Sequence, residues 1–232
     1  MSVLWSEKKE HLLILLVVML VLIGGGNASA ASTDPIRIGH VAALSGASAQ
    51  SGEAITRGLS LAIDQINAKG GLLGGRKAEL VQRDDESTPP KGLTAARELI
   101  FKEGVVAVFG GIDTPVSLAI VPLMNKEKRI FMGVWAAGTG ITRNSANPNY
   151  VFRVSAVDDL VDVKLLKYAH DKLGAKRAGL MLINNPWGQS NEKGLVAASR
   201  ASVSGRVTPI VPGRLATPSG LACVTGLASV RP

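Results

Sequence analysis

The sequence lacks most of the residue types that build metal centres and covalent cross-links. Its 232 residues include one cysteine and three histidines. The lone Cys223 cannot form an internal disulfide or a C-x-x-C motif, and no two histidines have the spacing of a zinc-binding helix. No nucleophile and base can be paired from the sequence either. These absences argue against a metal or other cofactor and against an enzyme.

Aromatic residues and negative charge are also scarce. Aromatics make up 4% of the chain, and the formal net charge is +8. A positive chain can bind nucleic acid, but here the basic residues are scattered and form no dense run interleaved with aromatics. Part of the excess comes from four arginines that follow the last acidic residue, Glu192: Arg200, Arg206, Arg214 and Arg231. Nucleic acid is therefore not an expected partner.

Residues 1–30 have the pattern of a cleaved secretory signal peptide. Lys8 and Lys9 precede the apolar run Leu12–Ile23, and small residues occupy the −3 and −1 positions in Ala28-Ser29-Ala30. The apolar run is about 12 residues long, whereas a membrane-spanning helix needs roughly 20. We therefore expect cleavage after Ala30 and a periplasmic protein, rather than one anchored in the membrane.

After the signal peptide, short apolar runs alternate with amphipathic segments. Apolar residues recur at helical spacing in 53–68, whereas 105–109 (VVAVF) is a continuous apolar run typical of a buried parallel strand. The pattern predicts an α/β fold, a parallel sheet with helices on both faces. The expected strands are 36–41, 77–83, 105–109, 130–134, 150–154 and 177–183, and the expected helices are 53–68, 91–103, 115–126, 157–173 and one that begins near Trp187.

In sheets of this kind, ligands bind outside the carboxyl ends of the strands. The segments expected to form a site are therefore the loops that follow the strands: Leu44–Ser51, Gly110–Pro115, Trp135–Thr142 and Asn184–Gln189.

These loops resemble those of the periplasmic leucine/isoleucine/valine-binding proteins. The segment 44–87 (LSGASAQSGEAITRGLSLAIDQINAKGGLLGGRKAELVQRDDES) has a Ser-Gly loop, an Ala-Ile-Asp-x-Ile-Asn helix, an Ala-Lys-Gly-Gly turn and an Asp-Asp pair in the family's order. FGGIDTPVSLAIVPL resembles the family's third strand and ligand-binding turn, and INNPWGQSNEKGL resembles the segment that enters its second lobe. The resemblance runs from Ile36 to about Ala198. It implies a type I periplasmic binding protein, in which two α/β lobes close over a small ligand.

The resemblance also implies which residues would bind that ligand. The first lobe would bind a carboxylate through hydroxyls and backbone N–H groups near helix starts, where the helix dipole favours an anion. An aromatic residue of the second lobe would cover the ligand on closure. The residues at the matching positions are Ser45, Gly46, Ser51, Thr114, Ala136, Ala137, Thr139 and Trp187.

Two departures from the family pattern bear on the ligand. Ala137 stands where the family usually has a threonine, and Thr139 lies two positions further on. Ser51 is small where the family often has an aromatic residue, so the ligand need not be a plain α-amino acid. Other roles also fit single residues: Ser45 and Thr114 could cap helices, and Trp187 could be an ordinary packed aromatic.

The sequence changes character near Ser199. From there onward it contains no Asp, Glu, Lys or aromatic residue and is rich in Arg, Pro, Ser, Gly and Ala. We interpret 31–154 as a complete first lobe, 155–198 as the start of a second lobe, and 199–232 as an aberrant tail, produced by a frameshift or else a genuine disordered tail. A partial second lobe would expose apolar surface and would bind a ligand weakly or not at all.

The function expected from the resemblance is that of the solute-binding component of an ABC transporter. Its partners would be a small ligand, an amino acid or related carboxylate, and a permease in the inner membrane. Two alternatives remain open from the residues: a ligand-sensing receptor or regulator of the same fold, and a non-functional truncated copy.

Overall fold

The structure is a computed structural model, and it describes residues 34–176 and 178–202. The predicted signal peptide and most of the predicted tail lie outside these residues. The elements, in chain order, are β1 (Ile36–Ala42), α2 (Ala49–Ala68), β2 (Ala78–Asp84), α3 (Pro89–Phe101), β3 (Ala107–Gly110), α4 (Thr114–Lys126), β4 (Ile130–Gly133), the 3₁₀ turn η1 (Thr139–Ile141), β5 (Val151–Arg153), α5 (Asp158–Leu173) and α6 (Pro186–Ser202).

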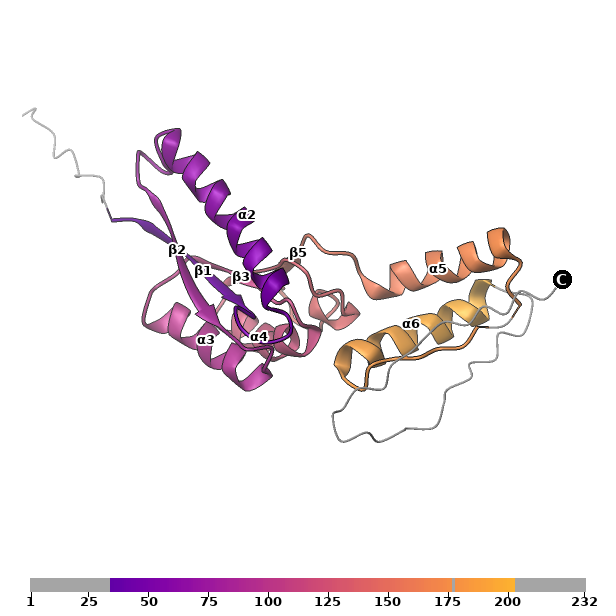
Figure 1. Cartoon of the computed structure of the whole chain (residues 1–232). Coiled ribbons are helices and arrows are strands. Elements are labelled where there is room, and N and C mark those ends of the chain that lie inside the picture. Colours follow the sequence, from indigo (N-terminus) through magenta and orange to yellow (C-terminus); the bar gives the residue numbers. More distant parts are fainter. Residues whose placement is uncertain (1–33, 177, 203–232) are drawn as a thin grey trace, which may run out of the picture. The chain divides into compact units, whose positions relative to one another are not determined.

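The strands form one parallel five-stranded sheet in the order β2-β1-β3-β4-β5 (Figure 1). The predicted α/β fold is therefore confirmed. The chain turns from β1 to β2 on one side and continues from β3 to β5 on the other, so the loops after β1 and β3 diverge. A divergence of this kind at the carboxyl edge of a sheet is where doubly wound folds bind their ligands.

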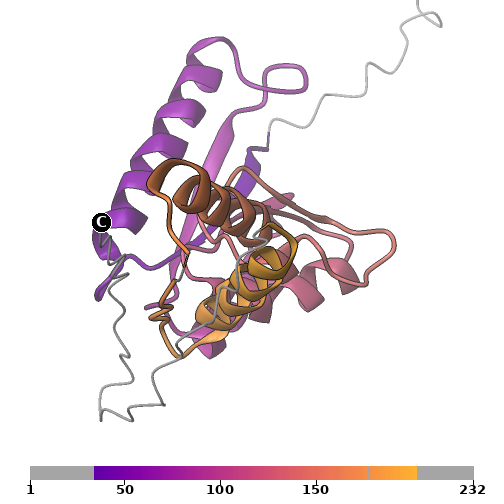
Figure 2. The same ribbon diagram turned by 90° about the vertical axis from the view of Figure 1, so that its right-hand side faces the viewer.

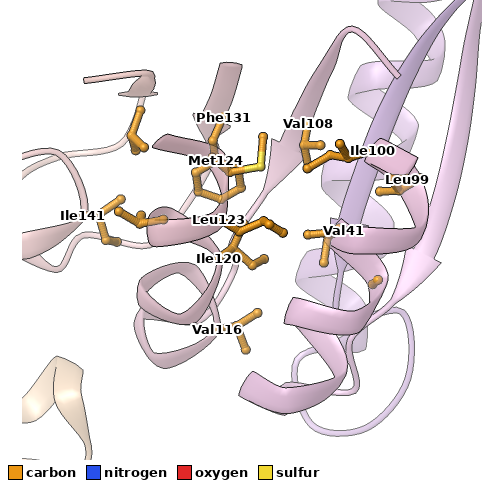
Figure 3. Packing of buried hydrophobic residues seen from close by; sticks show 14 of the residues in the cluster. Val41, Leu99, Ile100, Val108, Val116, Ile120, Leu123, Met124, Phe131 and Ile141 are labelled. Carbon is orange, nitrogen blue, oxygen red and sulfur yellow. The ribbon is translucent and has the colours of Figure 1, made fainter. Parts of the chain in front are cut away.

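The main hydrophobic core lies between the sheet and helices α3 and α4 (Figure 3). Val108 and Phe131 project from adjacent strands toward Ile120 and Met124 of α4, and all four side chains are fully buried. Prolines lie in the first turn of both helices, at positions where a missing N–H costs no intrahelical bond. This core fixes the first turn of α4, and with it the loop that follows β3.

Helix α2 packs on the other face of the sheet and begins earlier than the sequence pattern predicts. The expected start was residue 53, but α2 starts at Ala49, so Ser51 lies in its first turn. Gly46, at φ 77°, reverses the chain before the helix. Gly52 then lies against the Ala43 carbonyl, where a Cβ would come within 1.9 Å of the oxygen. The helix therefore starts close to the end of β1.

The face that α2 covers is only partly shielded. The helix is tied to β1 and β2 through Thr56, which contacts His40, and Asn67, which bonds to Ala78. The same face continues over β4 and β5, where Ile130, Phe152 and Val154 are 45%, 50% and 75% exposed. Large apolar side chains on neighbouring strands are thus open to solvent in this part of the fold.

Beyond β5 the described chain forms a pair of parallel helices, α5 and α6, which lie side by side (Figures 1 and 2). The small core between them contains Leu166, Leu195 and Ala198. The spacing of apolar residues in 157–173 predicts one apolar side of α5, formed by Leu160, Val161, Leu165, Leu166 and Ala169. This prediction was wrong in part, because Leu160, Val161 and Leu165 are exposed while Asp158 and Asp162 are buried. None of the described helices is long and apolar enough to cross a membrane.

The strand predicted at 177–183 is absent from the sheet: residues 178–183 belong to none of its strands. The apolar side chains of this segment instead pack against the α5–α6 core. A strand needs neighbours that pair with its backbone N–H and C=O groups, and sequence pattern alone does not supply them. Helix α6 continues past the predicted boundary at Ser199 to Ser202.

Candidate functional site

The residues predicted to bind the ligand lie in loops or helix starts that follow β1, β3 and β4, together with the first turn of α6. Because the strands are parallel, the loops after β1, β3 and β4 meet at one edge of the sheet. Ser45 and Gly46 are exposed, whereas Thr114 and Ala136 are buried. The hydrogen bonds of each loop show which polar groups remain available to a ligand.

The loop after β1 is held by the carboxylate of Asp84, at the end of the neighbouring strand β2. Asp84 Oδ1 accepts hydrogen bonds from the backbone N–H groups of Leu44 and Glu86, both at 2.9 Å. Partial burial alone would raise the pKa of Asp84, but bonds from the Ser45 hydroxyl and from these N–H groups hold it below its usual range. The N-cap position of α2 is Ser48 and carries no side-chain cap, so Ser45 does not cap this helix.

Thr114 is the first residue of α4 and is 3% exposed. Its Oγ1 accepts a hydrogen bond of 3.2 Å from the backbone N–H of Gly138. The residue at the N-cap position is Asp113, and no side chain caps the helix there. The capping role considered for Thr114 is thus not the one it has: it joins the start of α4 to the loop after β4, and its hydroxyl proton can still be donated.

The loop after β4 is fixed at almost every backbone group. Ala136 N–H donates to Gly111 O at 2.9 Å, and Ala137 O accepts from Asp158 N at 2.9 Å. Thr139 N–H donates to Ser190 Oγ of α6, and Thr139 Oγ1 accepts from Asp159 N at the start of α5. Ala136 and Thr139 are therefore engaged within the protein.

Within the described residues, the N–H of Ala137 makes no hydrogen bond in this loop. It belongs to the residue directly before Gly138, whose own N–H binds Thr114. A Cβ at Gly138 would lie 2.4 Å from Thr114 Cγ2, so the absence of a side chain there lets the loop approach α4. The sequence pattern did not single out this glycine. The result is an N–H donor and a hydroxyl donor close together at the start of a helix.

Trp187 lies in the first turn of α6 and is 46% exposed. Its indole Nε1–H donates to Asp158 Oδ1 at 3.4 Å, and its backbone N–H donates to Asn185 Oδ1 at 2.9 Å. An indole that is half exposed and held at one end presents its ring face to solvent. This arrangement suits an aromatic that covers a ligand better than one packed in a core.

Two buried carboxyl groups near these loops have raised pKa values. Burial, followed by the charges of Asp113 and Asp84, raises the pKa of Asp85 to about 6. Burial, followed by the charges of Asp158 and Asp159, raises the pKa of Asp162 to about 7. In residues 34–176 and 178–202, no three His, Cys, Asp or Glu side chains are placed to hold a metal ion. The groups available to a ligand at the carboxyl edge of the sheet are hydrogen-bond donors, the Ala137 N–H and the Thr114 hydroxyl.

Comparison with known proteins identifies the family to which this chain belongs. Residues 35–213 match the model of a family described as periplasmic binding protein. The chain belongs to the periplasmic binding protein family. The match continues past Ser199 to residue 213, and the point at which a tail departs from the family stays a prediction.

The names of relatives of this periplasmic binding protein mention two classes of ligand, branched-chain amino acids and aromatic carboxylates. A Leu/Ile/Val-binding protein of Rhizobium johnstonii is 28% identical over 177 residues, which cover 76% of this chain and 46% of the relative. A solved solute-binding protein of R. palustris in complex with benzoate is 31% identical, with a TM-score of 0.65 and coverage of 75% of this chain and 47% of that one.

A third relative is the branched-chain amino acid transporter substrate-binding protein of Streptococcus pneumoniae, solved in complex with isoleucine. It is 26% identical with a TM-score of 0.65, and the match covers 80% of this chain and 52% of that one. The chain thus spans about half the length of the relatives it matches, which agrees with a first lobe and only part of a second.

Proposed function

We propose that this periplasmic binding protein is the solute-binding component of an ABC uptake system and that it binds the carboxylate of a small ligand. The observation that supports the proposal is the pair of donors at the carboxyl edge of the sheet, the Ala137 N–H and the Thr114 hydroxyl. Export by the predicted signal peptide and delivery of solute to an inner-membrane permease are parts of the same proposal.

A carboxylate fits this pair for two reasons. It is acceptor-only and offers two oxygens, so one can meet an N–H while the other meets a hydroxyl. The donors lie at the amino end of α4, where the helix dipole also favours negative charge. Ser45 and Gly46 border the site in the exposed loop between β1 and α2.

The ligand class extends to carboxylates that carry no ammonium group. Relatives with an isoleucine complex and with a benzoate complex share this fold, and the group common to both ligands is the carboxylate. Ser51 has a small side chain and Trp187 is half exposed, and we expect a planar ring to be accepted between them. We therefore expect both benzoate and isoleucine to contact the Thr114–Ala137 pair through their carboxylates.

The test is a titration of the ¹⁵N-labelled chain followed by amide chemical shifts, which detect weak as well as tight binding. Benzoate and L-isoleucine should shift the amides of residues 114 and 137–139, and benzamide, which lacks the charge, should not. Thr114→Val removes the hydroxyl at nearly constant volume and should weaken binding about 10- to 100-fold, the cost of a hydrogen bond to a charged group.

The matched control is Thr94→Val, at an exposed position of α3, which should bind as the unaltered chain does. Equal shifts with benzamide, or shifts confined to residues far from the loop after β4, would show that no carboxylate site exists here.

A further inference from the structure

The orientation of the Ala137 N–H is set by contacts on the far side of its own peptide unit. A trans peptide is planar, and its C=O and N–H point in opposite directions. The N–H of Ala137 shares its peptide unit with the carbonyl of Ala136. Whatever holds the Ala136 carbonyl therefore also aims the Ala137 N–H, without touching it.

Two side chains from the end of β5 hold that carbonyl. Ser155 Oγ donates to Ala136 O at 2.8 Å, and a guanidinium nitrogen of Arg153 lies 3.5 Å from the same oxygen. The hydroxyl bond is of ordinary strength and length, while the second contact is long. Ser155 is thus the main anchor of this peptide unit, with Arg153 in support.

Arg153 also holds the carbonyl of Gly138, two residues further along the loop. Its other terminal nitrogen donates to Gly138 O at 2.7 Å, and the first donates to Ala156 O at 3.1 Å. Gly138 O shares its peptide unit with the N–H of Thr139, which points to Ser190. One guanidinium therefore holds two peptide units, the one before Ala137 through Ala136 O and the one after Gly138 through Gly138 O. The rigid fork geometry of arginine suits such a pair of contacts.

This use of an arginine is costly, which favours a positioning role over an incidental contact. Arg153 is half-buried, and its described hydrogen bonds go to main-chain oxygens instead of a carboxylate. Its Nε–H is buried without a partner. Burial lowers the pKa of the guanidinium, while the charges of Asp158 and Asp159 oppose that effect. An arginine stays protonated in any case.

We propose that Ser155 and Arg153 are positioning residues that aim the Ala137 N–H at the ligand by holding the carbonyls of the loop after β4. This rests on the proposed function only in naming the ligand. The loop would be oriented before the ligand arrives, so that binding does not have to order it, and such preorganisation increases affinity.

The direct test measures the direction of the N–H bond. Residual dipolar couplings of the full, ligand-free chain report the orientation of each amide. Ser155→Ala combined with Arg153→Met should change the couplings of Ala137 and Thr139, while those of β1 and α3 stay as they are. Ser155→Thr, which keeps a hydroxyl, should retain the coupling of Ala137. Ser145→Ala, in an exposed loop, is the matched control and should change neither.

Binding provides the second readout. Benzoate affinity should fall about 10-fold in Ser155→Ala, as expected for loss of one aligned donor, with no loss of thermal stability beyond that of Ser145→Ala. An unchanged Ala137 coupling in the double variant would overturn the positioning role. If the unaltered chain binds no benzoate or isoleucine, the proposed function fails, and the dipolar couplings still decide whether these residues hold the loop.

Discussion

The buried carboxyl of Asp162 should make the stability of this protein depend on pH in a specific direction. Asp162 lies on α5, is 2% exposed and faces Gly194 of α6, where a Cβ would come within 1.9 Å of its Oδ2. That oxygen has no hydrogen-bond partner. Burial and the neighbouring charges of Asp158 and Asp159 raise its pKa to about 7, well above the ordinary value for an aspartic acid. The folded protein therefore favours the neutral acid.

The sign follows from proton binding. Between the unfolded and the folded pKa, the folded state binds more protons, so stability falls as pH rises. The contribution is full below the unfolded pKa and is lost as pH passes about 7. The difference between the folded and the unfolded pKa of Asp162 corresponds to roughly 4 kcal/mol of folding stability in all, of which about 3 kcal/mol is lost between pH 5 and pH 8.

Replacement of Asp162 by asparagine tests this value, because the amide keeps the shape and cannot ionise. The free energy of unfolding in urea should fall less steeply with pH in Asp162→Asn than in the unaltered chain. The free energy of unfolding of the variant, measured relative to the unaltered chain, should be about 3 kcal/mol higher at pH 8 than at pH 5. Asp64→Asn, on the exposed side of α2, should follow the unaltered chain. Parallel pH profiles for Asp162→Asn and the unaltered chain would refute the reasoning.

Three further predictions follow from contacts described above. Gly138→Ala places a methyl group against Thr114 and should destabilise the protein by about 1–3 kcal/mol, as overpacking does, whereas Gly140→Ala, with its nearest contact at 3.6 Å, should be tolerated; thermal melting compares the two. Phe131→Ala empties the centre of a fully buried core and should cost about 3–5 kcal/mol in urea unfolding; a loss below 1 kcal/mol would contradict that core. Asp85→Asn should remove a fall in stability between pH 4 and pH 6 worth about 2 kcal/mol, because burial raises the Asp85 pKa to about 6; pH-dependent melting measures it, and an unchanged profile would count against that burial.

The first lobe could be predicted from the sequence almost element by element, because its signals are local. Proline at a helix start, a continuous apolar strand such as 105–109 and helical apolar spacing each act over a few residues. The start of α2 was missed by four residues, because it depends on Gly52 fitting against the carbonyl of Ala43. That is a contact between segments, which the periodicity of one segment does not contain.

The site was predictable as a set of loops but not as a set of bonds. The order of the strands brings Ser45, Thr114 and Ala137 to one edge, and the β-α alternation was sufficient to expect that. Which protons remain free depends on side chains from other strands, such as Asp84 and Ser155, whose partners are distant in sequence. The run FRVSA carries no pattern that marks its arginine and serine as loop anchors.

The second lobe was the hardest part to predict. Amphipathic spacing in 157–173 suggested one buried face, but α5 turns Asp158 and Asp162 toward α6 and leaves Leu165 exposed. A helix buries the side against which other elements pack, and the elements that surround α5 here are α6 and residues 178–182. Hydrophobic spacing alone cannot decide between two apolar sides.

The open part of the sheet face affects the fate of this polypeptide in a cell. Ile130 of β4, Phe152 of β5 and Val154, the residue after β5, are solvent-exposed apolar side chains on this face. Chaperones and quality-control proteases act on surfaces of this kind: they bind or degrade proteins whose apolar surface is incompletely buried. We therefore expect the steady-state amount of this protein to depend on how soon further polypeptide shields these side chains. Its abundance would then depend more on burial of the β4–β5 face than on the supply of any solute.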